Sequence, residues 1–178
     1  LAVGDLVETR DHGAQPLTWV GRRRLSFPGA DERQKPVEFR PGCLGPGRPR
    51  RALVVSPQHR ILIAAPELAA AAGTTQALAP AVAFEGLQGV RRMRGKRRVD
   101  YIALMLARHE VIEAEGVAVE SFLPGPVGLA TLSPFELLSL RAAAPTRARR
   151  APSPARPLLD ARLARQLGAL GAASPIPA

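Results

Sequence analysis

A serine and a histidine interrupt an apolar run near the middle of the chain. In VSPQHRILI, Ser56 and His59 stand three residues apart, and apolar residues occupy both ends of the run. An imidazole can give or take a proton near neutral pH, and a hydroxyl beside it can orient or polarise a carbonyl group. The same residues also suit a turn between two strands, with the histidine at the surface. The pattern alone therefore leaves acid–base chemistry and a structural turn open.

Two further histidines and one cysteine are candidates for chemistry elsewhere in the chain. His109 stands directly before Glu110, where it is either a second imidazole of the same site or a hydrogen-bonded histidine at a strand start. His12 lies in the turn RDHG and is expected to be structural or exposed. Cys43 lies in the loop PGCLGPG and is expected to be a packed or idle thiol. One cysteine and three widely separated histidines match no zinc-binding spacing, so we expect no metal and no cofactor.

The composition is that of one globular domain with a basic tail. The chain has 178 residues, 46% of them hydrophobic, and a formal charge of +10, which is enough apolar material for a core. Residues 141–178 hold seven arginines and one aspartate, whereas residues 1–140 hold 18 basic and 14 acidic residues. Aromatic residues make up 4% and provide no stacking platform. Specific nucleic-acid binding is therefore the least favoured of the functions considered.

The sequence says little about location or assembly. It contains no run of 18 apolar residues, so we expect no membrane span. No targeting signal is recognisable, and the localisation and oligomeric state stay open.

Short strand-like segments separated by turn residues must position the candidate side chains. Gly13 in DHGAQ favours a tight turn and predicts a hairpin, and Glu115-Gly116 predicts a second one. Val99–Ala107 has the length and bulk of a buried strand. The other strands are expected at Leu6–Arg10, Pro16–Arg24, Pro36–Arg40, Ala52–Val55 and Arg60–Ala64.

Helical signals are few before residue 133. Glu67–Ala72 is Ala-rich and stops at a glycine, and Ala79–Glu85 is expected to be one short helix. Ser133–Ala142 begins with a capping box and a proline at its first helical position. Pro145–Pro157 is expected to be unstructured, whereas Leu158–Leu170 carries a leucine stripe that predicts a docking helix. These patterns predict an all-β domain over residues 1–140 and a basic Pro/Ala/Arg-rich tail over residues 141–178 with a helix at residues 158–170.

Four segments in this order resemble the bacterial branch of the Hint (Hedgehog/intein) self-processing family. They are GDLVETRDHGAQPLTWVGRRRL (Gly4–Leu25), CLGPGRPRRALVVSPQHRILI (Cys43–Ile63), RHEVIEAEG (Arg108–Gly116) and ESFLPGP (Glu120–Pro126). The resemblance covers residues 1 to about 135 and implies a compact all-β fold with pseudo-two-fold symmetry. It also implies autoproteolytic chemistry, in which an N-terminal Cys or Ser attacks the preceding carbonyl and converts the amide to a thioester or ester, assisted by a Thr/Ser-x-x-His motif.

The resemblance assigns roles to three residues of this chain. Ser56-Pro57-Gln58-His59 matches the motif, so His59 is expected to give a proton to the leaving amide and Ser56 to orient the groups. His109 is expected near the same centre. The substrate is then the chain's own upstream segment, which in the family carries the nucleophile before a strand such as Gly4–Val7.

Departures from the family pattern keep a second interpretation open. The nucleophile is expected upstream of Leu1, and Cys43 does not replace it, so the chain as given is expected to be inactive. Glu120-Ser121 stand where splicing inteins have His-Asn, which does not support protein splicing, and Leu123 replaces an aromatic or His. The alternative is therefore an inert structural or interaction module with the same fold.

Overall fold

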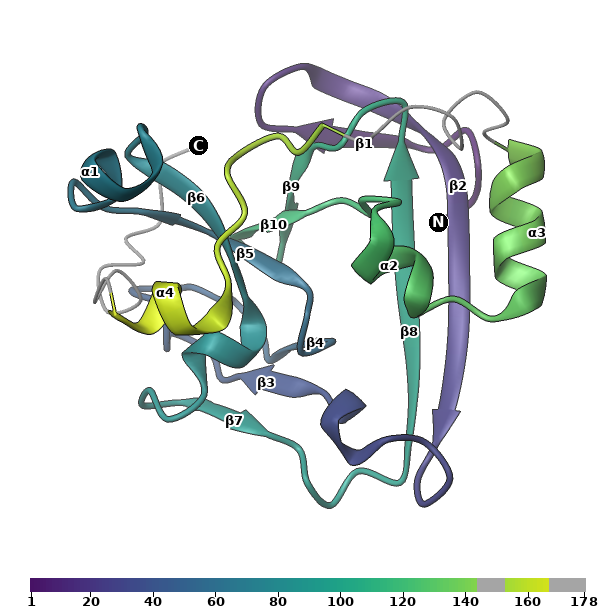
Figure 1. The fold of residues 1–178 in the computed structure, drawn as a ribbon, viewed down its shortest axis with the longest axis horizontal. Coiled ribbons are helices and arrows are strands. Elements are labelled where there is room, and N and C mark those ends of the chain that lie inside the picture. Colours follow the sequence, from purple (N-terminus) through teal and green to yellow (C-terminus); the bar gives the residue numbers. More distant parts are fainter. Residues whose placement is uncertain (144–152, 167–178) are drawn as a thin grey trace.

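Two antiparallel sheets make up the body of the protein (Figure 1). The computed structural model describes residues 1–143 and 153–166. The larger sheet has the order β6-β5-β10-β9-β1-β2-β8, and the smaller sheet has the order β4-β3-β7. The larger sheet contains β1 (Leu6–Thr9), β2 (Gly13–Ser26), β5 (Arg60–Ala64), β6 (Gln76–Pro80), β8 (Arg98–Leu106), β9 (Val111–Ala114) and β10 (Val117–Glu120). The smaller sheet contains β3 (Val37–Phe39), β4 (Leu53–Val55) and β7 (Val90–Arg92).

Short helices complete the fold, and the prediction of an all-β protein with a few C-terminal helices is confirmed. The helices are α1 (Leu68–Ala72), α2 (Pro126–Ala130), α3 (Pro134–Ala143) and α4 (Ala161–Gln166), with 3-10 turns η1 (Glu32–Gln34) and η2 (Ala81–Phe84). Within residues 1–143 and 153–166, no helix has the length and apolar character needed to cross a membrane.

Both predicted hairpins form. In the first, Leu6 pairs with Pro16 and Thr9 with Gly13, so β1 and β2 are joined by a tight turn. In the second, β9 and β10 are joined by Glu115 and Gly116, whose φ angles are 53° and 81°. Two successive positive φ angles are the geometry of a type I′ turn, which a glycine at the second position favours. This hairpin sets the register that brings the residues before β9 beside those after β10.

Two predicted elements differ from the observed ones. The strand predicted at Val99–Ala107 forms as β8, at the end of its sheet. The prediction that it is buried holds only for Met105 and Leu106, because its other residues are exposed or part-exposed. The helix predicted at Ala79–Glu85 is wrong in its first part, because Ala79 and Pro80 pair with β5 as the end of β6. Only Ala81–Phe84 is helical, as the 3-10 turn η2.

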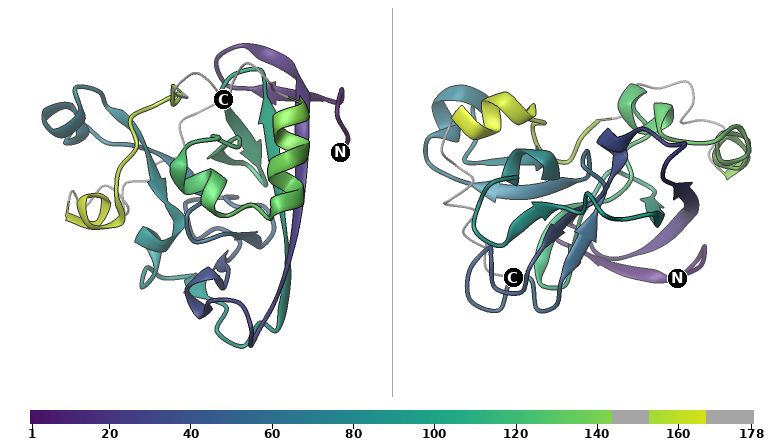
Figure 2. Two further views of the ribbon diagram at one scale, coloured as in Figure 1. Left: turned by 45° about the vertical axis from the view of Figure 1, so that its right-hand side comes forward. Right: turned by 90° about the horizontal axis from the view of Figure 1, so that it is seen from below.

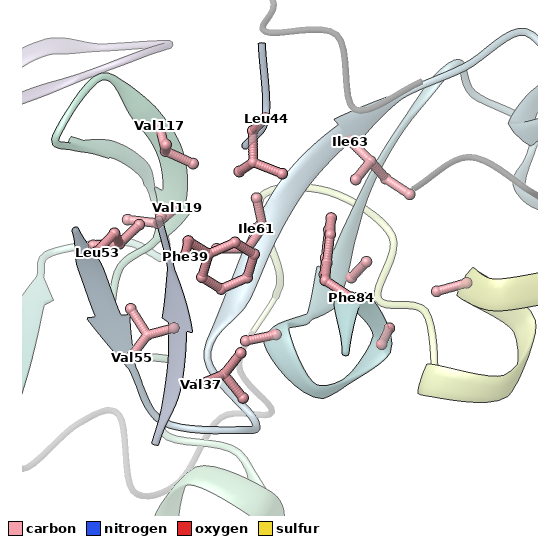
Figure 3. Packing of buried hydrophobic residues seen from close by; sticks show 14 of the residues in the cluster. Val37, Phe39, Leu44, Leu53, Val55, Ile61, Ile63, Phe84, Val117 and Val119 are labelled. Atoms are coloured by element: carbon pink, nitrogen blue, oxygen red, sulfur yellow. The ribbon is translucent and has the colours of Figure 1, made fainter. Parts of the chain in front are cut away.

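The main core lies between the smaller sheet and the strands β5, β6 and β10 (Figure 3). Phe39 from β3 and Phe84 from η2 meet edge to face, with ring centroids 5.5 Å apart. Ile61 and Ile63 of β5 are 1% and 0% exposed and pack into the same cluster. Burial of this apolar surface is the main force that holds the two sheets together.

A smaller core attaches α3 to the outer side of β2, as two views of the ribbon show (Figure 2). Trp19 is 4% exposed, and its indole N–H donates a hydrogen bond of 3.0 Å to Ser139 Oγ of α3. Gly21 lets the indole lie close, because a Cβ there would stand 2.2 Å from the ring. This agrees with the expectation that Trp19 is a core residue with a hydrogen-bonded polar edge.

Residues 153–160, named here the C-terminal strap, lie against β6 and lead into α4 (Figure 1). Leu78 N–H donates to Pro157 O (2.9 Å), and Leu159 N–H donates to Leu78 O (3.0 Å). Leu159 is 3% exposed, and Leu163 packs against the main core. The expectation that Pro145–Pro157 is unstructured therefore fails for residues 153–157, because main-chain hydrogen bonds to β6 and the side-chain contacts of Arg156 hold this segment. Residues 144–152, Leu167 and Leu170 lie outside the described residues, and the division at residue 140 stays a prediction.

Candidate functional site

The turn that joins β4 to β5 holds Ser56 and His59 in place. The main-chain N–H of His59 donates to Ser56 O (3.1 Å) and to Ser56 Oγ (3.2 Å). From η2, Ala81 N–H donates to His59 O (2.8 Å) and Val82 N–H donates to Pro57 O (2.9 Å). Hydrogen bonds within the turn and from η2 therefore hold the main chain of His59 in place.

Ser56 has a structural part in this turn. Its Oγ accepts the His59 main-chain N–H, the bond expected when a serine closes a short turn. The hydroxyl proton remains available for donation to another acceptor. Ser56 thus positions the backbone of His59 as well as facing the space in front of it.

A buried carboxylate lies beside the turn. Glu120, at the end of β10, is 9% exposed, and its Oε1 accepts a hydrogen bond of 2.9 Å from the Arg60 main-chain N–H. Its Oε2 lies 3.4 Å from Nε2 of His109. The pairing of β10 with β5 and with β9 brings these residues together, since Val119 is paired with Ile61 and Glu120 with Val111.

His109 lies behind Glu120 rather than at the surface. Its side chain is 1% exposed, and its Nδ1 accepts a hydrogen bond of 3.0 Å from the main-chain N–H of Ala155 in the strap. Its Nε2 has no hydrogen-bond partner among the described residues apart from the longer approach to Glu120. Of the two interpretations of this residue, the structure combines parts of each: His109 is a buried histidine before a strand, and it also lies next to the candidate centre.

The pKa of His59 is lowered from its ordinary value. Burial is the main cause, because it disfavours the charged imidazolium. The negative charge of Glu120 opposes this shift and raises the pKa, whereas His109 and Arg60 lower it further. His59 is therefore a neutral imidazole at neutral pH, ready to accept a proton before it can donate one.

These groups face a cavity of about 760 Å³. Its wall includes Ser56, His59, Arg60, Glu120, Ser121 and Tyr101. Apolar side chains with large exposed fractions also line it, namely Val54 (41%), Ile102 (52%) and Val127 (55%). A concave space with a few polar groups at one end and apolar walls elsewhere is the usual form of a binding site.

The other candidate residues lie apart from this cavity. His12, expected to be structural or exposed, is 45% exposed in its side chain, and its Nδ1 lies 2.9 Å from Oε2 of the buried Glu110. Cys43 is half-buried, and burial raises the pKa of its thiol above the ordinary value, which keeps it protonated. No cluster of three metal-ligating side chains occurs in the part of the chain that the structure describes.

Sequence reasoning did not assign a role to Glu120 or Arg60 in the site. Glu120 was noted only as a residue that replaces the intein histidine, and its chemistry depends on a pairing between distant strands. The strand pattern gave no signal for its burial, because Val117 and Val119 occupy one face of β10 and Glu120 lies on the opposite face with Ala118.

A family model described as Hint domain matches residues 1–126 of the chain. Neither the search of curated proteins nor the search of solved structures gave a match. The matched range contains the turn with Ser56 and His59, the hairpin of β9 and β10, and Glu120.

Proposed function

The chain belongs to the Hint domain family, and we propose that it is a self-processing domain, which cleaves a peptide bond in the upstream part of its own polypeptide. One observation carries the proposal: Ser56, His59 and Glu120 face the same cavity, where the part-buried His59 has a lowered pKa and is neutral at neutral pH. The reaction is an acyl shift from nitrogen to sulfur or oxygen. Protein splicing is not proposed.

The neutral imidazole of His59 suits both proton transfers of this reaction. A Cys or Ser of the upstream segment attacks the preceding carbonyl, and His59 accepts the proton of its thiol or hydroxyl. The new C–S or C–O bond forms as the C–N bond breaks, and the imidazolium returns the proton to the departing nitrogen. The product is a thioester or ester and a free amine, with all atoms conserved. His59 is thus a base first and the proton donor afterwards.

Glu120 stabilises the stage between the two proton transfers, when His59 carries the extra proton. When His59 becomes an imidazolium, the carboxylate of Glu120 stabilises its positive charge, in line with the direction in which Glu120 moves the pKa of His59. Ser56 keeps the imidazole in place through the main-chain hydrogen bond and can donate its own proton to the attacked carbonyl oxygen.

The cavity suits an extended peptide. β8 and β4 are end strands of their sheets, and residues from both line the cavity. An end strand can pair with an added strand through main-chain hydrogen bonds, while pockets take alternate side chains. The exposed apolar side chains of Val54 and Ile102 give such a strand a surface to cover.

The test uses a longer polypeptide in which a segment with a Cys or Ser nucleophile is placed before Leu1. Single-turnover cleavage is induced with excess thiol or hydroxylamine and followed by intact mass. His59→Ala should slow cleavage by about a hundred- to ten-thousand-fold, because both proton transfers lose their carrier. Ser56→Ala should slow cleavage by a smaller factor than His59→Ala. Arg51→Ala is the matched control, since Arg51 is exposed and is not among the residues that line the cavity.

An unchanged rate in His59→Ala would contradict the proposal. It would favour the alternative, an inert structural or interaction module of the same family. That alternative has its own support, because the hydrogen bonds of the turn are the ones a purely structural turn requires.

A further inference from the structure

The main-chain amide of Ala155 fixes the state of a buried histidine. Its N–H donates a hydrogen bond of 3.0 Å to Nδ1 of His109. A main-chain N–H can only donate, so Nδ1 must be unprotonated and the proton of the neutral ring must be on Nε2. That proton then faces Oε2 of Glu120, which lies 3.4 Å from Nε2.

The strap that carries this amide is held by contacts of Arg156 and of Ala155 itself. Arg156 makes a two-pronged ion pair with Asp11, with distances of 2.8 and 3.0 Å, and its Nε donates to Gln76 Oε1 (2.9 Å). The side chain of Ala155 packs against the cluster of Leu62, Leu78 and Val111. The position of the amide is therefore set by the sheet and not by His109.

The strap lies outside the part of the chain that the family model matches, which ends at residue 126. Two of its residues, Pro154 and Leu158, also line the cavity. The strap therefore adds to the candidate site a wall and a hydrogen-bond donor that the matched region does not contain.

We propose that the Ala155 amide is a positioning group of this site, which holds His109 in its Nε2–H tautomer so that His109 orients the carboxylate of Glu120 toward His59. The reverse tautomer would present a lone pair to the Glu120 carboxylate, and the two would repel each other. Glu120 would then lose the orientation that stabilises a charged His59. The catalytic consequence rests on the proposed function, whereas the positioning itself does not.

Replacement of Ala155 by proline removes the donor, and replacement by glycine keeps it. The chain of residues 1–178 is labelled with ¹⁵N-histidine, and long-range ¹H–¹⁵N spectra at pH 8 report which nitrogen of His109 carries the proton. The parent protein and Ala155→Gly should show Nε2–H. In Ala155→Pro the ratio of the tautomers should shift toward Nδ1–H by about two- to tenfold, which is the loss of one net hydrogen bond.

A second variant tests the anchor of the strap without touching the donor. Arg156→Ala should shift the ratio in the same direction by a smaller factor. Arg51→Ala is its control, because Arg51 makes a comparable two-pronged pair with Glu115 at the surface, and it should leave the ratio unchanged. Main-chain amide spectra verify that each variant is folded.

An unchanged ratio in Ala155→Pro overturns the proposal, as does an equal shift in Ala155→Gly. These readouts need no cleavage, so they decide the positioning even if the proposed function fails. In a polypeptide that does cleave, Ala155→Pro should be slower than Ala155→Gly. Equal rates there would overturn the link from His109 to the reaction.

Discussion

At the scale of single residues, the negative charge of Glu120 influences the protonation of His59. Burial lowers the pKa of His59, and Glu120 limits that shift. A carboxylate that is 9% exposed is costly unless it is paired, and here the Arg60 main-chain N–H and the ring of His109 lie beside it. Glu120 thus influences His59 without being held by a formal ion pair with it.

Glu120→Gln should lower the pKa of His59 further. The amide oxygen can still accept from Arg60 N–H, but the negative charge that favours the imidazolium is gone. The midpoint is measured from the His59 ring protons in an NMR pH titration. Glu113→Gln is the control, since Glu113 is an exposed partner of Arg50 and should leave the midpoint unchanged. A midpoint that rises in Glu120→Gln would contradict this account.

Single residues also show which contacts of the site could not be predicted from the sequence. The types and spacing of Ser56 and His59 indicated a turn with a capacity for chemistry, and the structure has that turn. Glu120 lies across the predicted hairpin of β9 and β10 from His109, but Ala155 approaches His109 from the distant C-terminal strap and could not be predicted as its partner. The contact of His12 with the buried Glu110 was missed for the same reason, since it joins two different strand ends.

At the scale of elements, local signals were the most reliable. The capping box at the start of α3 forms as predicted: Ser133 N–H and Oγ–H donate to Glu136 Oε2 (2.8 and 2.7 Å), and Glu136 N–H donates to Ser133 Oγ (3.3 Å). Elements that depend on distant partners were predicted less well. Ala79 and Pro80 form a strand against β5 although the segment is Ala-rich, because pairing outweighs intrinsic propensity. The end position of β8 is likewise set by the whole sheet and not by its own residues.

Ser133→Ala should lower the free energy of unfolding by about 1 kcal/mol, the usual cost of losing an N-cap side chain. Glu136 is 7% exposed and would lose its hydroxyl partner. Urea unfolding, followed by the fluorescence of Trp19 beneath α3, measures the change. Ser26→Ala, an exposed serine at the end of β2, should have almost no effect. A loss as small as that control in Ser133→Ala would show that packing alone holds α3.

At the scale of the whole molecule, the candidate site lies where separate parts of the fold meet. The cavity is lined from the smaller sheet by Val54, from the larger sheet by Ile102, from α2 by Val127 and from the strap by Leu158. These residues are far apart in sequence, and each looks ordinary in its own segment. The strand and turn patterns predicted the fold class, but only the packing of two sheets, a helix and the strap creates the cavity that the part-buried His59 faces.

The same burial makes the stability of the folded protein depend on pH. An unfolded His59 takes up a proton near its ordinary pKa of about 6.5, whereas the folded protein resists it, because burial lowers the pKa of His59. The unfolded state therefore binds more protons as the pH falls below about 6.5, and stability decreases with falling pH until the folded pKa is passed.

A second decrease in stability is expected below pH 4.5, since hydrogen bonds from Arg92 and Arg156 lower the pKa values of Glu85 and Asp11. His59→Gln should remove the first decrease in stability and leave the second. The free energy of unfolding in urea is measured between pH 7.5 and 3.5. The control variant Gln58→Ala should show both decreases. If His59→Gln retained the full loss of stability between pH 7 and 5, the burial of His59 would not be its cause.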